Sequence, residues 1–399
     1  MKKIYIASYH QSKFGKLFDL SVPDIVKSAV QGVCDEIAVT PKVFDVGSIA
    51  AVCNMSLNQQ GLLSGLMAEV EGLQGKPIEA VENACASGGQ AVLSVIQKLL
   101  LGWGEVGIAV GYEKMRQDDG KMDGKRIGEA LGYFSHPAER EGKVYVFPHI
   151  FAEVMRDYMD AHGTSEEELA AIAVQEYANA NQNPYAQMRK VQLSLDQAVQ
   201  IEGINRYIVD GLPLKTYDCS QISDGYAALI IATEEGLQRI GLQKADCVEI
   251  AGYAQATDPL QKGGRDVLRP AGALAAMNQA YERAGVTAAD VSVAEVHDCF
   301  SVMGAIGAEV LGKAAYGQGA RYWNDGRASV DGECGINTSG GLIAKGHPIG
   351  ATGIAMIGWC AWQLQGKVPA ELQVTDAGVA ATFNIGGPIC ASVCTVLKA

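Results

Sequence analysis

Short apolar runs alternate with amphipathic segments over the first 115 residues of the chain. KIYIAS, GSIAAVC, KPIEAVE and EVGIAVGYEKM have the continuous apolar character of buried strands. SVPDIVKSAVQGVCDEI, LLSGLMAEVEGL and ASGGQAVLSVIQKLLLG carry apolar residues at helical spacing. Strands that alternate with helices predict a mainly parallel sheet with helices on both faces, here over residues 1–115.

The pattern changes between residues 116 and 215. This stretch is more polar, and its clearest elements are two helices, FAEVMRDYMDAHG and SEEELAAIAVQEYANANQNP, the second with Ser165 as its N-cap. We interpret residues 116–215 as an inserted loop domain that lies over the first sheet. Residues 216–247, which include SQISDGYAALIIATEE, return to the first half as a strand.

Strand and helix patterns alternate again over residues 248–399. VEIAGYAQAT and VSVAEVHDCF are predicted strands, and ALAAMNQAYERAG and SVMGAIGAEVLG are predicted helices. The segment NTSGGLIAKGHPIGATGIAMIGWCAWQLQG joins a glycine-rich turn to an apolar helix, as NACASGGQAVLSVIQKLLLG does in the first half. The sequence therefore predicts two α/β halves related by duplication, with reactive residues at strand ends near their junction.

Composition and charge restrict the class of protein. The chain has 399 residues, 48% hydrophobic and 19% charged, which is enough for a large core. Its formal net charge is −13, so it has no general attraction for nucleic acid, and a phosphorylated ligand would need a local basic patch. No apolar run approaches the ~18 residues of a membrane span, and MKKIYIASYHQSKFG is typical of a first strand rather than a signal peptide. We therefore expect a cytoplasmic protein.

Ten cysteines are scattered along the chain without a CxxC pair. In a cytoplasmic protein, scattered cysteines are mostly small buried hydrophobic residues, and we expect this of seven or eight of them. No metal site is predicted, because no histidine accompanies Cys390 and Cys394 in ICASVCTVLK.

Cys85 stands at the start of a helix in VENACASGGQ. Unpaired backbone N–H groups and the positive end of the helix dipole favour a thiolate there, by up to ~2 kcal/mol, which predicts a pKa near neutrality. A base is still required to remove the proton, and the same N–H groups can stabilise the oxyanion of an attacked carbonyl. The alternative is that Cys85 only fills space.

Two histidine motifs lie in the second half. His347, in GHPIGATG, sits between glycines that allow close backbone approach, and it is a candidate base toward a thiol. His297 and Cys299 end a predicted strand in EVHDCFS and point the same way, whereas Asp298 points away from the pocket. The alternatives are that His347 caps a turn and that His297 bonds Asp298 for structural reasons.

The motifs NACASGGQA, GYEKM, SDGYAALI, HDCFS, NTSGGLIAKGHPIGATG and NIGGP, in this order, resemble those of thiolases. FPHIFAEVMRDYMDAHGTSEEELAAIAVQEYANANQNPYAQ is similar to the loop region of the sterol-carrier-protein thiolase branch, which includes bacterial and archaeal acetyl-CoA acetyltransferase-like proteins. The resemblance covers nearly the whole chain. It implies an α/β fold of two duplicated halves in a five-layered αβαβα arrangement with an inserted loop domain.

The resemblance also implies the activity, an acyl-CoA C-acyltransferase that cleaves a 3-ketoacyl-CoA or forms one by Claisen condensation. Cys85 would carry the acyl group as a thioester, His347 would activate Cys85 and help hold the thioester oxygen, and Gly386 would supply an oxyanion-hole N–H. Asn384 stands where most thiolases have a second reactive cysteine. In the branch resembled, Cys299 takes over as acid/base.

His297 replaces an asparagine found in many thiolases and would help bind the substrate oxygen. No metal or permanently bound cofactor is implied, and coenzyme A and acyl-CoA are substrates. Basic residues of the insertion are candidate ligands for the phosphates of coenzyme A, namely Lys121, Lys125, Arg126 and Arg189. The resemblance further implies a homodimer and allows a small partner protein with a zinc ribbon and an OB fold.

Three other functions stay open at this point. A ketosynthase-like condensing enzyme would have no use for Cys299, and an aldolase that cleaves β-hydroxyacyl-CoA would have no use for Cys85. A non-catalytic subunit of a thiolase-like complex would not need all the motif residues together. The acyl group and the direction of the reaction are also open.

Overall fold

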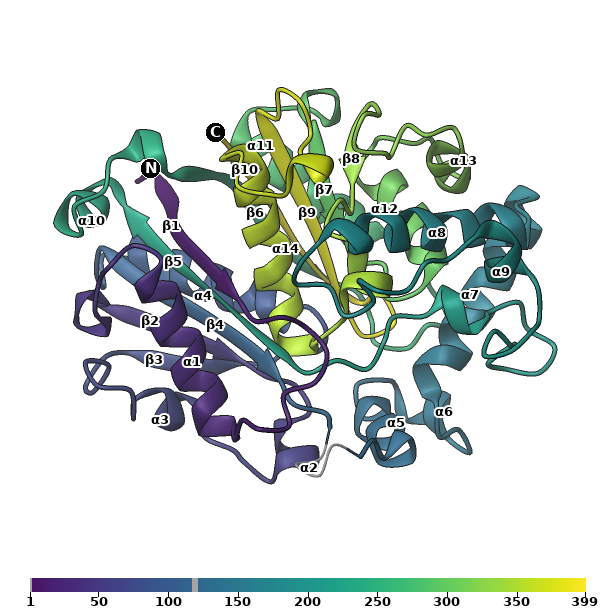
Figure 1. Ribbon diagram of the computed structural model, residues 1–399, viewed down its shortest axis with the longest axis horizontal. Coiled ribbons are helices and arrows are strands. Elements are labelled where there is room, and N and C mark those ends of the chain that lie inside the picture. Colours follow the sequence, from purple (N-terminus) through teal and green to yellow (C-terminus); the bar gives the residue numbers. More distant parts are fainter. Residues whose placement is uncertain (1, 117–120) are drawn as a thin grey trace.

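Within the described residues, ten strands form one hydrogen-bonded sheet that runs through both halves of the chain (Figure 1). The computed structural model describes residues 2–116 and 121–399. The strands are β1 (Ile4–Gln11), β2 (Val46–Ala50), β3 (Ile78–Val81), β4 (Val106–Glu113), β5 (Gly225–Thr233), β6 (Val248–Thr257), β7 (Val293–Val296), β8 (Gly335–Ile336), β9 (Val379–Gly386) and β10 (Ala391–Lys398). Their order is β3-β2-β4-β5-β1-β6-β10-β9-β7-β8, with β1 and β6 paired only at Tyr5↔Glu249 and Ile6↔Val248 among the described residues.

The sheet order confirms the predicted duplication. When the strands of each half are numbered from its own start, both halves have the order 3-2-4-5-1. In each half the strands that correspond to β3, β2 and β4 are parallel, and the remaining pairs are antiparallel. Two copies of one unit therefore meet at β1 and β6.

Helices cover both halves and fill the space between them. The helices outside the insertion are α1 (Val22–Asp35), α2 (Asn54–Asn58), α3 (Leu63–Met67), α4 (Ser87–Leu100), α10 (Glu234–Arg239), α11 (Ala271–Ala284), α12 (Ser301–Val310), α13 (Gly319–Asn324) and α14 (Ile349–Leu364). α1 packs on the first-half strands and α11 on the second-half strands, while α4 and α14 contact each other and strands between these outer layers. This is the expected five-layered arrangement. α14 is apolar on all sides and is buried along nearly its whole length, as a central helix must be.

Glycines allow the first turns of α4 and α14 to touch. A Cβ on Gly88 would lie 2.8 Å from the carbonyl oxygen of Gly350, and one on Gly353 would lie 2.2 Å from the amide nitrogen of Gly89. Any larger residue would separate the two helix N-termini. Cys85 and His347 precede these two helices, so the glycine contact brings the two halves of the site together.

The inserted helices are α5 (Gly124–Gly132), α6 (Pro137–Arg140), α7 (Val146–His162), α8 (Glu166–Gln182) and α9 (Leu195–Val199). The two longest, α7 and α8, do not lie over the first sheet as predicted, whereas α5 contacts α2 of the first half. α7 and α8 pack beside α12 of the second half, and α8 also contacts α13 (Figure 1). The physical reason is the apolar face of α7, which joins the second-half core; the rings of Phe151 and Phe300 stack with centroids 4.6 Å apart.

Local signals within the insertion are confirmed in detail. Ser165 caps α8 with a reciprocal capping box to Glu168. Residues 117–120, near the predicted start of the insertion, lie outside the described residues. Across the described part of the chain, no helix combines the length and apolar character needed to cross a bilayer.

Candidate active site

Cys85 occupies a sharp turn between β3 and α4. Ala84, just before it, has a left-handed φ of 47°. Ser87 holds this turn, because its hydroxyl accepts a hydrogen bond from the Asn83 amide (2.7 Å) and donates one to the Ala84 carbonyl (2.6 Å). The turn leaves Cys85 half-buried on the wall of a cavity.

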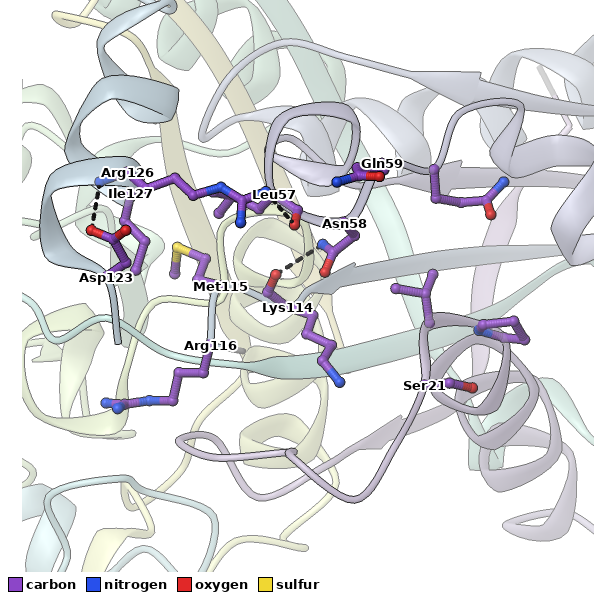
Figure 2. A pocket seen from close by; sticks show the side chains of 13 residues that line it. Ser21, Leu57, Asn58, Gln59, Lys114, Met115, Arg116, Asp123, Arg126 and Ile127 are labelled. Atoms are coloured by element: carbon purple, nitrogen blue, oxygen red, sulfur yellow. Dashed lines mark hydrogen bonds between the residues drawn. The ribbon is translucent and has the colours of Figure 1, made fainter. Parts of the chain in front are cut away.

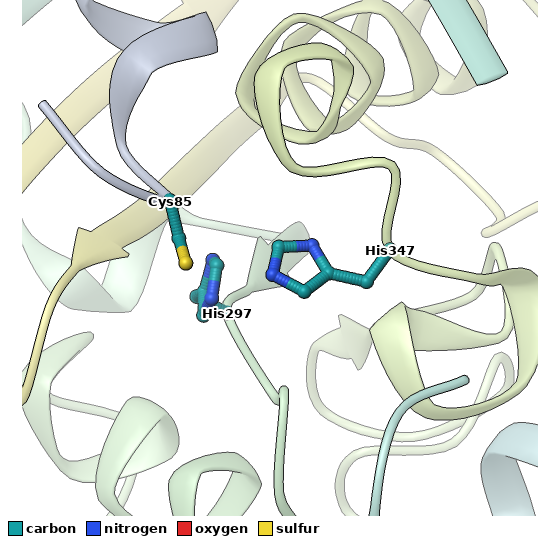
Figure 3. Close-up of side chains that lie close together, drawn as sticks. All are labelled: Cys85, His297 and His347. Carbon is teal, nitrogen blue, oxygen red and sulfur yellow. The ribbon is translucent and has the colours of Figure 1, made fainter. Parts of the chain in front are cut away.

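Cys85, His297 and His347 come together from three distant segments (Figure 3). The thiol sulfur and one ring nitrogen of each histidine all lie within 4.8 Å of one another. The two imidazole rings meet edge to face, with centroids 5.0 Å apart and an interplanar angle of 87°. The structure thus brings together the nucleophile, base and oxygen-binding residues predicted from three separate motifs.

The hydrogen bonds of His347 determine which ring nitrogen carries its proton. Nδ1 lies 2.7 Å from the hydroxyl oxygen of Thr352. That hydroxyl donates its own hydrogen to the carbonyl of Pro348 (3.0 Å), so it accepts from Nδ1–H. Nε2 is therefore left unprotonated, as a base toward Cys85 requires.

His297 has the opposite tautomer because of Asn384. The Asn384 amide nitrogen donates one hydrogen to the carbonyl of Cys85 (3.0 Å) and the other to His297 Nδ1 (3.0 Å). Nδ1 is then an acceptor, and Nε2 carries the ring proton. Nε2 is buried without a partner among the described residues, and His297 lines the cavity. This N–H is a preorganised donor for a substrate oxygen.

Burial keeps all three groups neutral. It lowers the pKa of His347 to about 3 and holds the pKa of His297 well below its usual value, with the nearby His347 adding to the second effect. Burial and, second, the charge of buried Glu113 raise the pKa of Cys85 to about 12, against a smaller opposite effect of the Gly387 amide. The prediction of a Cys85 pKa near neutrality is therefore wrong. Desolvation and a carboxylate outweigh the helix dipole.

This protonation pattern determines what the cluster can do. Zinc also accepts thiolate and neutral imidazole ligands, and its binding would remove the thiol proton. A protonated thiol beside an unprotonated imidazole nitrogen is suited to transfer of its proton at the moment of attack. The arrangement of this thiol and the two imidazoles therefore suits nucleophilic and acid–base chemistry.

Cys299 and the glycines of NIGGP complete the immediate surroundings. Cys299 is 8% exposed and lines the same cavity, and burial, followed by the nearby Cys85, raises its pKa well above the usual value. Gly386 belongs to β9, whereas its neighbour Gly387 lines the cavity and hydrogen-bonds the Cys85 sulfur through its amide. Sequence reasoning missed Gly387.

The cavity in front of Cys85 is large and mostly apolar. Its volume is about 530 Å³. Six aromatic side chains line it, from the insertion and from the segment after Cys299: Phe134, Tyr145, Phe147, Phe151, Tyr207 and Phe300. Such a space fits an apolar group well beyond the size of acetyl.

The basic residues predicted for phosphate binding do not gather at this cavity. Lys121, Lys125 and Arg189 are exposed and are not among its lining residues. Arg126 lines a neighbouring cavity of about 360 Å³ and donates hydrogen bonds to the carbonyls of Ser56 and Leu57.

Figure 2 shows Arg126, Lys114 and Arg116 extending in different directions around this second cavity, without converging on one point. Arg206, which is exposed, is the arginine among the described residues that line the cavity in front of Cys85. Sequence reasoning missed Arg206, because it lies in a polar stretch with no distinguishing pattern.

Asn384→Asp is expected to lower kcat by about 10²- to 10³-fold, the usual effect of losing one oxyanion donor. The substitution keeps the shape of the side chain but removes both amide hydrogens, so His297 donates from Nδ1 and loses the proton on Nε2. Steady-state kinetics measure the loss, and an unchanged melting temperature shows that the fold is intact. Wild-type kcat in a folded Asn384→Asp protein would exclude this role for Asn384.

Comparisons with known proteins identify the family of the chain. Residues 4–235 match the family model described as "Thiolase, N-terminal domain", and residues 254–399 match "Thiolase C-terminal domain-like". The chain is 34% identical over 387 residues to an acetyl-CoA acetyltransferase of Methanothermobacter thermautotrophicus, covering 97% of both chains. It is 30% identical over 404 residues to sterol carrier protein 2 of Rattus norvegicus, covering 97% of this chain and 70% of that protein.

Solved structures share the fold. An Ltp2-ChsH2(DUF35) aldolase superimposes with a TM-score of 0.82 at 20% identity, over 100% of this chain and 98% of that one. Human mitochondrial 3-ketoacyl-CoA thiolase in complex with CoA superimposes with a TM-score of 0.74 at 18% identity, over 100% and 98%.

Proposed function

The chain belongs to the thiolase family and is an acyltransferase of the thiolase type, and we propose that it cleaves or forms 3-ketoacyl-CoA through an acyl group carried on Cys85. The observation that carries this proposal is the grouping of the Cys85 thiol with two neutral imidazoles of opposite tautomer, each with one ring nitrogen within 4.8 Å of the sulfur. His347 offers a lone pair and His297 offers an N–H. One nitrogen takes the thiol proton while the other binds the oxygen that becomes negative.

Acylation of Cys85 follows from this geometry. In the thiolysis direction, His347 Nε2 removes the thiol proton as the sulfur attacks the ketone carbon of the 3-ketoacyl-CoA. His297 Nε2–H hydrogen-bonds an oxygen of the substrate as negative charge develops there. Backbone amides beside Cys85 stabilise the oxygen of the resulting thioester. The Gly387 amide, which hydrogen-bonds the Cys85 sulfur, is one candidate, and the Gly386 amide, which the resemblance implies, is the other.

Cys299 serves the other half of the reaction. Cleavage of the carbon–carbon bond releases the enolate of acetyl-CoA, and the Cys299 thiol protonates its α-carbon. Coenzyme A then gives its thiol proton to the resulting thiolate and takes the acyl group from Cys85. In the reverse direction, the Cys299 thiolate removes an α-proton from acetyl-CoA for a Claisen condensation.

The apolar cavity supports a substrate with an acyl group larger than acetyl. Each buried CH₂ contributes roughly 0.8 kcal/mol, so a few additional carbons against the aromatic lining raise kcat/KM by at least about tenfold. Arg206, which lines this cavity and is exposed, is the basic residue best placed to meet a phosphate of coenzyme A.

A thiolysis assay over a panel of 3-ketoacyl-CoA substrates tests the proposed function. We expect coenzyme A-dependent cleavage, with medium-chain or aromatic acyl groups preferred to acetoacetyl-CoA by about tenfold or more. Cleavage of β-hydroxyacyl-CoA without any thiolysis would instead identify an aldolase. Absence of both reactions, with the folded protein and each substrate, would favour a non-catalytic subunit.

We also propose a homodimer, joined at β3, which is the terminal strand of the described sheet order and is half-exposed or exposed along its length. Light scattering should then give about twice the chain mass of 42.1 kDa.

A small zinc-ribbon and OB-fold protein is also proposed as a partner. This proposal rests on the resemblance to the sterol-carrier-protein thiolase branch and on the DUF35 component in the name of the aldolase that shares the fold. Adding a small zinc-ribbon and OB-fold protein to the thiolysis assay tests it.

A further inference from the structure

Two buried carboxyl groups meet beside the catalytic segment. Glu176 lies on α8, Asp298 lies between His297 and Cys299, and neither has exposed surface. The two side chains are in hydrogen-bond contact, yet Glu176 Oε2 receives no hydrogen bond from an N–H or O–H donor of the described residues. Two carboxyl groups in contact repel unless one is protonated. Glu176 therefore carries the proton and donates it to Asp298.

Asp298 holds the segment that leads to His347. Its carboxylate accepts hydrogen bonds from the backbone amides of Leu342 (2.8 Å) and Ile343 (3.1 Å). These amides belong to η5 (Gly341–Lys345), a π-helical turn that ends two residues before His347. Both amides donate, and hydrogen bonds from N–H groups favour the ionised form of Asp298.

Glu176 also connects α8 of the insertion to the end of β7, which precedes His297. Its Oε1 accepts a hydrogen bond from the Asn337 amide nitrogen (2.8 Å). The Asn337 side-chain oxygen accepts from the backbone amide of Val296 (2.7 Å), the last residue of β7. The protonated Glu176 side chain therefore hydrogen-bonds both Asn337, which holds the end of β7, and Asp298, which holds the turn before His347.

The surrounding charges make this proton necessary. The titratable groups around the pair are Glu295 and Lys345, which form a buried ion pair (3.4 Å), Tyr177 on α8, and His297 and Cys299 on either side of Asp298. With three carboxylates and Lys345 ionised, the formal charge would be 1 − 3 = −2. The proton on Glu176 halves it, and burial with the charge of Asp298 raises the pKa of Glu176 well above its usual value.

We propose that protonated Glu176 is a positioning residue for the catalytic segment and that loss of its proton inactivates the enzyme at alkaline pH by separating the Glu176–Asp298 contact. The inference rests on the proposed thiolase reaction. Glu176 touches no reacting atom in this account. It acts through Asp298, which places His297, Cys299 and, through η5, His347.

Glu176→Gln tests this directly. A glutamine amide donates to Asp298 and still accepts from Asn337, but it has no proton to lose. Thiolysis and Cys85 acylation are measured from about pH 6 to about pH 10. Glu176→Gln should stay within about threefold of wild type at neutral pH and should move the alkaline loss of activity to higher pH. Glu167→Gln, an exposed position on the same helix, should keep the wild-type profile.

Unfolding as a function of pH separates this proposal from the proposed function. The pKa of Glu176 is higher in the folded than in the unfolded chain, so the folded state binds one more proton between these two values. The free energy of unfolding must therefore fall as pH rises across that interval, and this fall should be smaller in Glu176→Gln. Identical alkaline limbs and identical stability profiles for both proteins would overturn the positioning role. A difference in stability alone, without any acylation of Cys85 in wild type, would leave the carboxyl pair intact and reject the thiolase function.

Discussion

Cys299→Ala is expected to slow the exchange of the α-protons of acetyl-CoA with solvent by about 10²- to 10⁴-fold, the usual effect of a positioned acid or base. Transfer of an acetyl group from acetyl-CoA to Cys85 should stay within a few-fold of wild type. The reason is that acylation by a simple acyl-CoA uses Cys85, His347 and His297, whereas removal of an α-proton needs the second thiol. Exchange is measured by NMR in deuterated buffer, and acylation by mass spectrometry.

The matched control is Cys219→Ala. Cys219 lines the same cavity, and burial raises the pKa of its thiol well above the usual value, as for Cys299. Its loss should leave exchange unchanged. Exchange at the wild-type rate in Cys299→Ala, or an equal loss in Cys219→Ala, would remove Cys299 from the acid/base role.

His347→Asn is expected to slow acylation of Cys85 by about 10²- to 10⁴-fold and to leave the fold intact. The thiol has a pKa raised to about 12, so at neutral pH little thiolate forms unless a base takes the proton during attack. Because burial lowers the pKa of His347 to about 3, its Nε2 stays unprotonated above that value. Wild-type acylation should therefore show no loss as pH falls from about 8 to about 5, where an ordinary histidine would titrate.

The control for this variant is His10→Asn. His10 is on β1 and pairs with Glu36 at 3.0 Å, outside the cavity. An inflection near pH 6.5 in wild-type acylation would contradict the neutral, desolvated base described here. Unchanged acylation in His347→Asn would show that another group takes the thiol proton.

The sequence predicted the layers well because their signals are local. Apolar runs such as KIYIAS and the all-round apolar segment of α14 identify buried strands and a central helix without knowledge of their partners. The packing of the insertion was not predictable in this way. The apolar face of α7 suits either half, and its contact with α12 shows that it packs on the second half.

The site shows the same division between local and distant signals. Cys85, His347 and Cys299 stand in motifs whose glycines and neighbours are visible in the sequence, and the structure places all three at one cavity. Asn384 acts on His297 across 87 residues, and nothing near either residue indicates that contact.

Burial explains why the pKa of Cys85 and the contact of Asp298 with Glu176 could not be predicted from the sequence. The pKa of Cys85 depends on desolvation and on Glu113, which the sequence places 28 residues away without any pattern that links the two. Asp298 does not line the cavity, as predicted, although residues 297–299 follow β7 (Val293–Val296) and are not part of the strand. Its contact with Glu176 of the insertion was not predictable, since it depends on where α8 packs.

The measurement that tests the central claim most directly is the site of covalent acylation. The protein is incubated with a 3-ketoacyl-CoA or with acetyl-CoA, quenched in acid and digested, and its peptides are mapped by mass spectrometry. Acylation through Cys85 predicts one acyl group per chain on the peptide that contains Cys85, lost from wild type on treatment with hydroxylamine, which cleaves thioesters. It predicts no acyl-cysteine in Cys85→Ser. An acyl group found only on another cysteine, with Cys85 unmodified, would contradict it.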